Sequence, residues 1–281
     1  MRPSPSRRAF LKVAASAAGL CCLSGFQLEP GLRIVSARPL PYAHRLLADP
    51  DTPPDAWPPA DVLLLPAHAA ARLIALGEAL NLGGEVAARP GRPHDPDGAF
   101  TVPHSTAFAA LVSRGGSQAA RSHGDAPRSL AELWQADAAW PHSVRLALGA
   151  ALMRRGYSPN DTHPGRLAEC ERDLLRLRPR LAADPAAAVR QGSGPALAWA
   201  EGPLLAGGLS AALPLEGALF SEYDWVIPRR TARAGRALEF LRAQPSARAV
   251  PGAWLRARAV PLAPLPPEAR ARVATLWARL H

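Results

Sequence analysis

The segment Ser221–Trp225 concentrates side chains that could bind a charged ligand. It lies in a run with the pattern of a β-strand and reads Ser-Glu-Tyr-Asp-Trp. Because side chains of a strand point alternately to its two faces, Glu222 and Asp224 share one face, and Tyr223 and Trp225 share the other. Carboxylates bind ammonium groups, and aromatic rings bind methylenes and cations. Only one face can point to a ligand, so either the acids or the aromatic rings are predicted to serve it.

A second pair of binding candidates lies at Trp199 and Glu201. The apolar run Ala196–Trp199 is predicted to be a strand, and Glu201 follows two residues later, so both side chains would point to the same face of an extended chain. A tryptophan on an apolar strand is also typical of a core position. The sequence therefore leaves two roles open for Trp199, a platform for a ligand and a core residue.

Two histidines follow predicted strands. His68 comes after the run Asp61–Pro66 and at the start of a predicted helix, where it either donates to an anion or caps the helix at the surface. His104 follows Val102-Pro103 and either lines a connection between two parts of the chain or faces solvent.

Sequence signatures of catalysis are absent. The eight histidines have no metal-ligand spacing, and the chain contains no G-x-S-x-G, H-E-x-x-H, C-x-x-C or P-loop motif. We therefore predict no metal, no cofactor and no enzymatic activity. Cys170 lies on a predicted helix and is expected to be inert.

The chain is basic, with a formal net charge of +10. Its arginines are scattered at helical spacing among alanines and leucines, without interleaved aromatic residues and without a basic block. A nucleic-acid-binding face needs a clustered basic stripe. We therefore expect no nucleic-acid partner, and we expect the arginines to lie on solvated faces of helices.

Residues 1–25 have the pattern of a twin-arginine export signal. Arg7-Arg8 precede Ala-Phe-Leu-Lys, and the apolar run Val13–Leu23 follows. This run is about half of the roughly 20 residues that span a membrane, which argues against a permanent membrane helix. We predict export to the periplasm by the twin-arginine machinery. Two processing routes stay open: Cys21 or Cys22 is the lipidated first residue of a lipoprotein, or both belong to the apolar run.

The remaining residues, about 255 of them, are predicted to form an α/β structure, because short apolar strands alternate with amphipathic helices. Asp61–Pro66 has the continuous apolar character of a buried parallel strand. Other predicted strands are Leu32–Ser36, Phe100–Pro103, Ala107–Ser113, Ala196–Trp199 and Leu219–Ile227. Predicted helices are Tyr42–Ala48, Ala69–Leu80, Leu130–Gln135, Val144–Arg155 with Gly156 as its cap, Leu167–Leu177 and Ala232–Ala243.

A series of segments occurs in a characteristic order. The series comprises Asp61–Pro66, Thr101–Pro103, Ser129–Trp134, Arg155–Asp161, Leu197–Trp199, and Pro214–Phe220 with Val226–Pro228. In this order the segments resemble the periplasmic spermidine/putrescine-binding proteins of ABC importers, over about Asp61 to Ala249. The predicted export signal agrees with this resemblance independently.

The resemblance implies a two-lobed periplasmic binding fold of type II, with a ligand in the cleft between lobes that close by hinge motion. It implies a first lobe at 26–105, a second lobe at 106–220, and a return crossing with C-terminal helices at 221–281. Phe100–Ser113 would cross to the second lobe, and Leu219–Ile227 would cross back. One strand and one helix that usually precede Asp61 in this family look missing, so the first lobe is expected to be short.

The ligand site departs from the family pattern at His142–Leu146. The resemblance places an acidic pair and a glutamate there, whereas this chain has His142 and Arg145. An aromatic pair expected after Pro66 is also replaced, while Trp199 falls at a matching aromatic position. Polyamines should therefore bind poorly, and the ligand is expected to be neutral, zwitterionic or anionic. The expected contacts are His68, His104, His142, Arg145, Trp199, Glu201, Glu222, Tyr223 and Asp224.

The predicted function is solute binding for an ABC importer, in which the protein delivers a small molecule to a permease of the inner membrane. Two alternatives stay open. A degenerate relative could act as a periplasmic interaction or sensory protein without tight ligand binding. A cofactor enzyme is the weaker alternative, suggested only by the frequent use of twin-arginine export by redox enzymes.

Overall fold

A computed structural model describes residues 31–38, 40, 43–47, 50–86, 91–114, 129–191, 194–201, 209–244 and 259–280. The predicted export signal, with Cys21 and Cys22, lies outside the described residues. None of the helices in these ranges has both the length and the apolar character that crossing a membrane requires.

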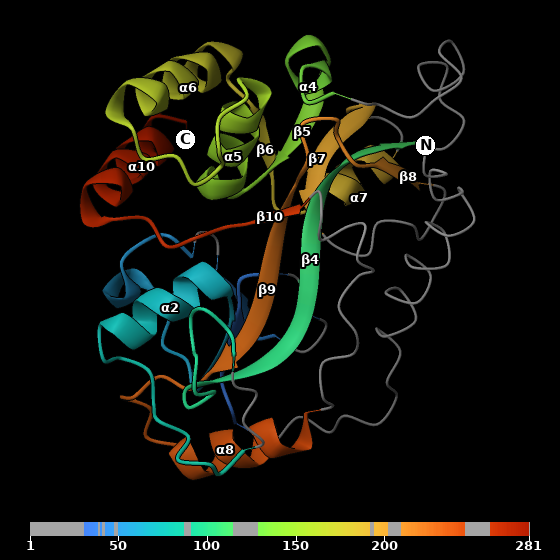
Figure 1. Cartoon of the computed structure of the whole chain (residues 1–281). Coiled ribbons are helices and arrows are strands. Elements are labelled where there is room, and N and C mark those ends of the chain that lie inside the picture. The colour runs from blue at the N-terminus through green and yellow to red at the C-terminus, as the bar shows by residue number, and fades with distance from the viewer. Residues whose placement is uncertain are drawn as a thin grey trace, which may run out of the picture.

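Within the described residues, ten strands form one sheet that extends through both halves of the molecule (Figure 1). The strand order is β2-β1-β3-β9-β4-β7-β5-β6, with β10 beside β9 and β8 beside β4. The strands are β1 (Ile34–Ser36), β2 (Arg45–Leu46), β3 (Val62–Pro66), β4 (Thr101–Arg114), β5 (Ala138–Pro141), β6 (Arg180–Ala182), β7 (Leu197–Glu201), β8 (Leu209–Ala212), β9 (Ala218–Val226) and β10 (Ala259–Pro261).

Two long antiparallel strands, β4 and β9, join the two lobes (Figure 1). At one end β9 pairs with β3 of the first lobe, and at the other end β4 pairs with β7 of the second lobe. The two-lobed α/β architecture is therefore confirmed, with β4 and β9 as the long strands that run through both parts of the sheet. The pairing of β4 with β9 is irregular between Pro103 and Ser105, which sets His104 apart from the regular ladder.

In the first lobe, β3 is buried along its whole length because helices cover both faces of the sheet. Leu63 and Leu65 pack with α2 (Ala67–Ala75) on one face. Val62 and Leu64 pack with α8 (Ala234–Ala243) on the other. A short 3-10 helix, η1 (Pro54–Ala56), precedes β3. This double coverage explains the continuous apolar run.

In the second lobe, α5 (Val144–Arg154) is central, and every residue from Val144 to Met153 is buried. Gly149 brings this helix close to β9, because a Cβ there would lie 2.8 Å from Leu219 Cδ1. Gly156 follows the helix with a φ of +76° and confirms the predicted cap. Helices α6 (Pro164–Leu177) and α10 (Pro267–Leu280) pack against α5, and α4 (Glu132–Gln135) belongs to the same core cluster. Helix α7 (Pro185–Arg190) packs against the strands in a separate cluster.

Two expectations about the elements were wrong. The predicted helix Tyr42–Ala48 contains strand β2 instead, because Arg45 and Leu46 pair in parallel with β1 and complete the edge of the sheet. The predicted strands at 100–103 and 107–113 are one strand, since the polar residues between them also pair with β9.

Candidate ligand cavity between the lobes

A cavity of about 500 Å³ lies between the two lobes. The first lobe contributes α2 and the loop before β4, the second lobe contributes the segment after α5 and the chain around β10, and β9 passes between them. Its volume falls in the range of small-molecule sites. The lining residues are Ala67, His68, Ala71, Pro93, His94, Asn160, Phe220, Ser221, Glu222, Ala259, Pro261, Leu262, Ala263 and Pro264.

The cavity forms where β9 exchanges one neighbouring strand for another. Parallel pairing with β10 ends at Phe220, and antiparallel pairing with β3 begins at Tyr223. Ser221 and Glu222 lie between these two stretches and line the cavity. Figure 1 shows β10 and α2 on the same side of β9. The sheet therefore opens an edge of the crossing strand to a ligand at the junction of the lobes, as expected for a switch in strand neighbours.

His68 lines the cavity from the first turn of α2 and is only 7 % exposed. Its Nε2 lies 3.6 Å from Asp51 Oδ1, which is an electrostatic contact and too long for a hydrogen bond. Burial alone would raise the pKa of Asp51, but the neighbouring His68, Arg145 and Arg72 hold that pKa below its ordinary value. Arg72 also donates to the carbonyl oxygens of residues 50–52, which fixes this loop beneath the cavity.

Glu222 and Asp224 differ in availability although they share a face of β9. Asp224 is 1 % exposed and is bound by two side chains of the loop before β4. Arg92 donates to its Oδ1, and His94 Nε2 lies 2.7 Å from its Oδ2. Glu222 lines the cavity and has no hydrogen-bond or ion-pair partner among the described residues. One acid therefore holds the loop, while the other is free to meet a ligand.

His94 was not predicted from the sequence. It lines the cavity and is oriented by Asp224, which lies 130 residues further along the chain. The only local signal was the density of charged and breaker residues at Arg92–Asp95. Such a signal marks a structured loop, but it does not reveal the distant carboxylate that positions the imidazole.

Arg145 lies behind the cavity wall, 1 % exposed. Its guanidinium donates to Asn160 Oδ1 at 3.2 Å and to the carbonyl oxygen of Ala263 at 3.1 Å, and both of these residues line the cavity. Asn160 donates in turn to the carbonyl oxygen of Pro261 at 2.8 Å. Burial lowers the pKa of Arg145, whereas Asp51 opposes this shift. Arg145 therefore holds the second-lobe wall in place and does not line the cavity itself.

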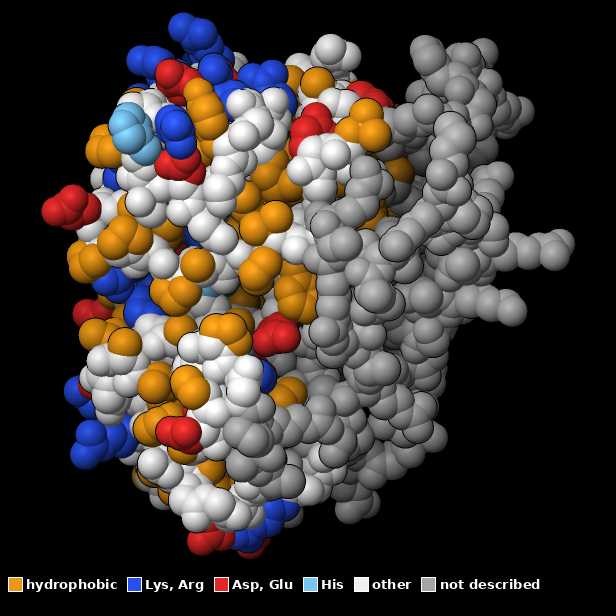
Figure 2. All heavy atoms as spheres, viewed as in Figure 1, with side chains coloured by type: hydrophobic (Ala, Val, Ile, Leu, Met, Phe, Trp, Pro, Cys, Tyr) orange, Lys and Arg blue, Asp and Glu red, His pale blue; other side chains and the backbone are white. Residues whose placement is uncertain are grey.

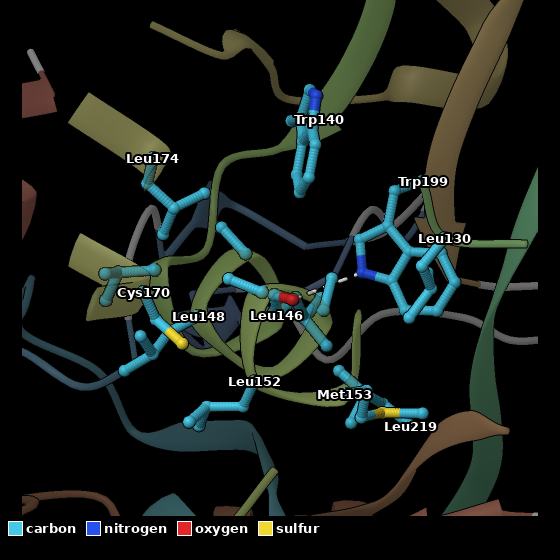
Figure 3. Packing of buried hydrophobic residues seen from close by; sticks show 14 of the residues in the cluster. Leu130, Trp140, Leu146, Leu148, Leu152, Met153, Cys170, Leu174, Trp199 and Leu219 are labelled. Carbon is cyan, nitrogen blue, oxygen red and sulfur yellow. Dashed lines mark hydrogen bonds between the residues drawn. The ribbon is translucent and has the colours of Figure 1, made fainter. Parts of the chain in front are cut away.

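Three other predicted contacts lie away from the cavity. Trp199 is completely buried in the core of the second lobe, and its Nε1 donates to the carbonyl oxygen of Leu146 at 3.2 Å (Figure 3). His142 packs edge-on against Trp277 with ring centroids 4.9 Å apart. His104 packs against Trp225 at the same centroid distance. Burial lowers the pKa of His104 to about 4, and the nearby Arg38 contributes to the shift.

Glu201 and Tyr223 contact each other apart from the cavity. The Tyr223 hydroxyl donates to Glu201 Oε2 at 2.5 Å, and Arg38 lies over the Tyr223 ring at 5.2 Å. Burial, followed by the charge of Glu201, raises the pKa of Tyr223 well above its ordinary value. Tyr223 and Trp225 both pack in the cluster that contains α8. The structure thus brings His68 and Glu222 to the cavity and leaves the other predicted contacts elsewhere.

The described part of the visible surface carries no single basic stripe. Figure 2 shows Lys and Arg side chains spread over the upper, left and lower margins of this face, and hydrophobic side chains scattered across it. Within the ranges that the structure describes, no group of three or more His, Cys, Asp or Glu side chains could hold a metal ion.

Comparison with known proteins finds similarity in structure only. No protein-family model matches the sequence, and no curated protein matches it either. A spermidine/putrescine ABC transporter protein of Listeria monocytogenes superimposes with a TM-score of 0.67 at 13 % identity, covering 79 % of this chain and 83 % of its own.

Two further solved structures share the fold. A glucopine-bound periplasmic binding protein of Agrobacterium tumefaciens B6 has a TM-score of 0.65 at 10 % identity, covering 88 % of this chain and 99 % of its own. A periplasmic thiamin-binding protein has a TM-score of 0.58 at 16 % identity, covering 92 % and 97 %. The chain therefore has the two-lobed fold of periplasmic binding proteins.

Proposed function

We propose that this chain is an exported solute-binding protein of an ABC importer, with its ligand in the cavity between the lobes. The observation that carries the proposal is the composition of the cavity wall, to which α2, the segment after α5 and the crossing strand all contribute. A ligand that touches both lobes stabilises their closed arrangement, because it can make all of its contacts only there. The closed form is what a permease of the inner membrane would recognise.

The solved relatives support solute binding without fixing the solute. They include a protein of a polyamine transporter, a binding protein in complex with glucopine and a thiamin-binding protein. Polyamines, glucopine and thiamin differ in charge and shape, so the fold is compatible with several ligand classes. The twin-arginine signal predicted at residues 1–25 supports a periplasmic location. Lipid attachment through Cys21 or Cys22 stays a prediction.

We further propose that the ligand is not a polyamine. Spermidine and putrescine carry several ammonium groups, each of which needs an acceptor inside the site. Glu222 is available in the cavity, but Asp224 is already paired with Arg92 and His94. Among the described residues, the aromatic lining consists of Phe220 and the two histidines, because Trp199 is in the core. The cavity therefore offers a polycation too few partners.

Titration calorimetry with the purified mature protein tests the ligand proposal. Loss of two charge-assisted hydrogen bonds, each worth roughly 1.5–3 kcal/mol, corresponds to at least a hundredfold weaker binding. We therefore expect no saturable heat with spermidine or putrescine at micromolar concentration. Submicromolar binding of spermidine that disappears in Glu222→Gln would show that the remaining acid suffices, and the proposal would be wrong.

A further inference from the structure

The wall of the cavity carries a negative charge at Glu222 and a positive potential near His68 and the start of α2. We propose that the cavity binds a small zwitterion, whose ammonium group meets Glu222 and whose carboxylate meets His68 and the N-terminus of α2. This inference rests on the proposed solute-binding function and narrows the class of its ligand.

The ammonium end is defined by Glu222. Its carboxylate lines the cavity, is partly buried, and has no partner among the described residues. A partly buried carboxylate without a partner is costly, and a ligand ammonium group would satisfy it. The other acids nearby, Asp224 and Asp95, are already bonded, Asp224 by Arg92 and His94 and Asp95 by Thr101. The crossing strand therefore presents one unsatisfied negative charge.

The carboxylate end is defined by the start of α2. No side chain caps this nine-residue helix, whose first residues Ala67 and His68 line the cavity. The N-terminus of a helix carries partial positive charge and favours an anionic group. The independent observation is His68, which lines the same cavity with a side chain that is only 7 % exposed; its Nε2 lies beside Asp51, whereas its Nδ1 has no hydrogen-bond partner among the described residues. Both features favour a ligand carboxylate at this end.

Buried charges behind the wall reinforce this polarity. Asp51 lies beside His68, but two guanidiniums, Arg72 and Arg145, act on this one carboxylate. Both arginines are more than nine-tenths buried, so water screens them weakly. The excess of positive charge beneath α2 favours an anionic group there. It opposes a second ammonium group and so disfavours a dication.

Apolar residues fill the space between the two ends. Phe220, Leu262, the prolines at 93, 261 and 264 and the alanines at 71, 259 and 263 form most of the remaining wall. An aliphatic or aromatic body between the charged groups would bury its surface against them. A free amino acid with an apolar side chain has the ammonium group, the carboxylate and the apolar body.

The test uses the mature protein and the twenty proteinogenic amino acids as probes, first by thermal shift and then by titration calorimetry. We expect at least one apolar amino acid to bind. Its amide, which lacks the carboxylate, and its N-acetyl derivative, which lacks the ammonium group, should each bind roughly ten- to 150-fold more weakly, the effect of one charge-assisted hydrogen bond.

Variants assign each end. Glu222→Gln should weaken the amino acid at least tenfold while leaving the N-acetyl derivative unchanged, and His68→Ala should weaken the amino acid while leaving the amide unchanged. Glu239→Gln, on the exposed face of α8, is the matched control and should bind like the unaltered protein. Thermal unfolding without ligand shows whether each variant is folded. If only His68→Ala fails to fold, the binding of the amide and of the N-acetyl derivative to the unaltered protein still decides the question.

Failure of the inference differs from failure of the proposed function. If a neutral solute, a polyamine or thiamine binds and no amino acid does, the cavity is a solute site and the zwitterion inference is overturned. Equal affinity for the amino acid, its amide and its N-acetyl derivative would also overturn it. If no solute of any of these classes binds, both proposals fail.

Discussion

At the scale of single residues, Glu222 and Asp224 show how pairing decides function. Both acids lie on the same face of β9, as strand alternation predicts. Arg92 and His94 come from a loop about 130 residues earlier in the chain, and of these two acids they bind Asp224 and not Glu222. Glu222 faces the cavity without such a partner. The type of each residue and its face of the strand could be predicted from the sequence. Whether its carboxylate is free to bind a ligand depends on a contact with a distant segment.

His104 should make the stability of the protein depend on pH. Burial holds the pKa of its imidazole at about 4 in the folded chain, against 6.5 in the unfolded chain, with Arg38 adding to the shift and Asp224 opposing it. Between these values the unfolded chain takes up a proton that the folded chain does not, so stability falls as the pH drops from about 6.5 to 4. Over this window the loss should approach about 3 kcal/mol.

Urea unfolding of the unaltered protein and of His104→Phe measures this effect. Phenylalanine keeps a ring against Trp225 and cannot take up a proton. The free energy of unfolding of the variant should therefore gain about 3 kcal/mol relative to the unaltered protein between pH 7 and pH 4. Parallel loss of stability in both proteins over that window would mean that His104 is not the responsible group.

At the scale of elements, the segments that carry the family resemblance prove to be structural. Glu216 of the Pro-x-Glu-Gly segment accepts hydrogen bonds from the Ser129 hydroxyl and the Leu130 backbone, so two of the motif segments bind each other. Asp61 accepts from Arg33 and Thr231, and although burial opposes it, these bonds lower the pKa of Asp61 to about 2. Such motifs fix how the elements pack, which is why they predicted the fold.

The lining of the candidate cavity was less predictable, because it depends on contacts between distant segments. His68 and Glu222 could be found because each stands at a recognisable place, the start of a helix and a face of a strand. His94, Asn160 and the wall at 259–264 could not, because they reach the cavity through loop geometry and through contacts between distant segments. For Trp199 the sequence left two roles open. The structure places its side chain in the core of the second lobe and not at the cavity.

The contact between α5 and β9 should be sensitive to one methyl group. Alanine at position 149 would place its Cβ 2.8 Å from Leu219 Cδ1, and Leu219 is completely buried. Overpacking costs roughly 1–3 kcal/mol, and the better helix propensity of alanine returns about 0.5–1 kcal/mol. Gly149→Ala should therefore lower the free energy of unfolding by roughly 1 kcal/mol, and by at most about 2.5 kcal/mol.

Two comparisons isolate this effect in urea unfolding. Gly235→Ala in α8 is the control, since no atom lies within 4 Å of the new Cβ, and it should be neutral or slightly stabilising. Combined with Leu219→Val, which removes the clashing atom, Gly149→Ala should cost much less than it does alone. Full additivity of the two changes would contradict the proposed contact.

At the scale of the whole molecule, one sheet is shared by both lobes, so lobe movement must bend the paired strands β4 and β9. The irregular pairing at His104 lies within this crossing. β10 then returns the chain from the first-lobe helix α8 to the second-lobe end of β9. The cavity lies beside this junction, where a bound solute would contact both lobes at once.

Export of the chain is predicted from residues 1–25, which lie outside the described residues. Changing Arg7-Arg8 to Lys-Lys should trap the precursor in the cytoplasm, because the twin-arginine machinery reads the arginine pair as an address. Cell fractionation followed by immunoblotting measures it. Arg2→Lys, outside the pair, is the control and should be exported normally. Undiminished export of the Lys-Lys variant would exclude the twin-arginine route.

The most direct test of solute binding in the cavity is native mass spectrometry of protein purified from the periplasm. We predict one bound small molecule per chain in the unaltered protein and in Leu76→Trp, which places its ring at the exposed C-terminal end of α2. Ala71→Trp on the same helix would fill the cavity with its side chain and should carry no ligand. A folded Ala71→Trp variant that carries the same molecule at the same occupancy, or unaltered protein that carries none and binds none when solutes are added, would contradict the account.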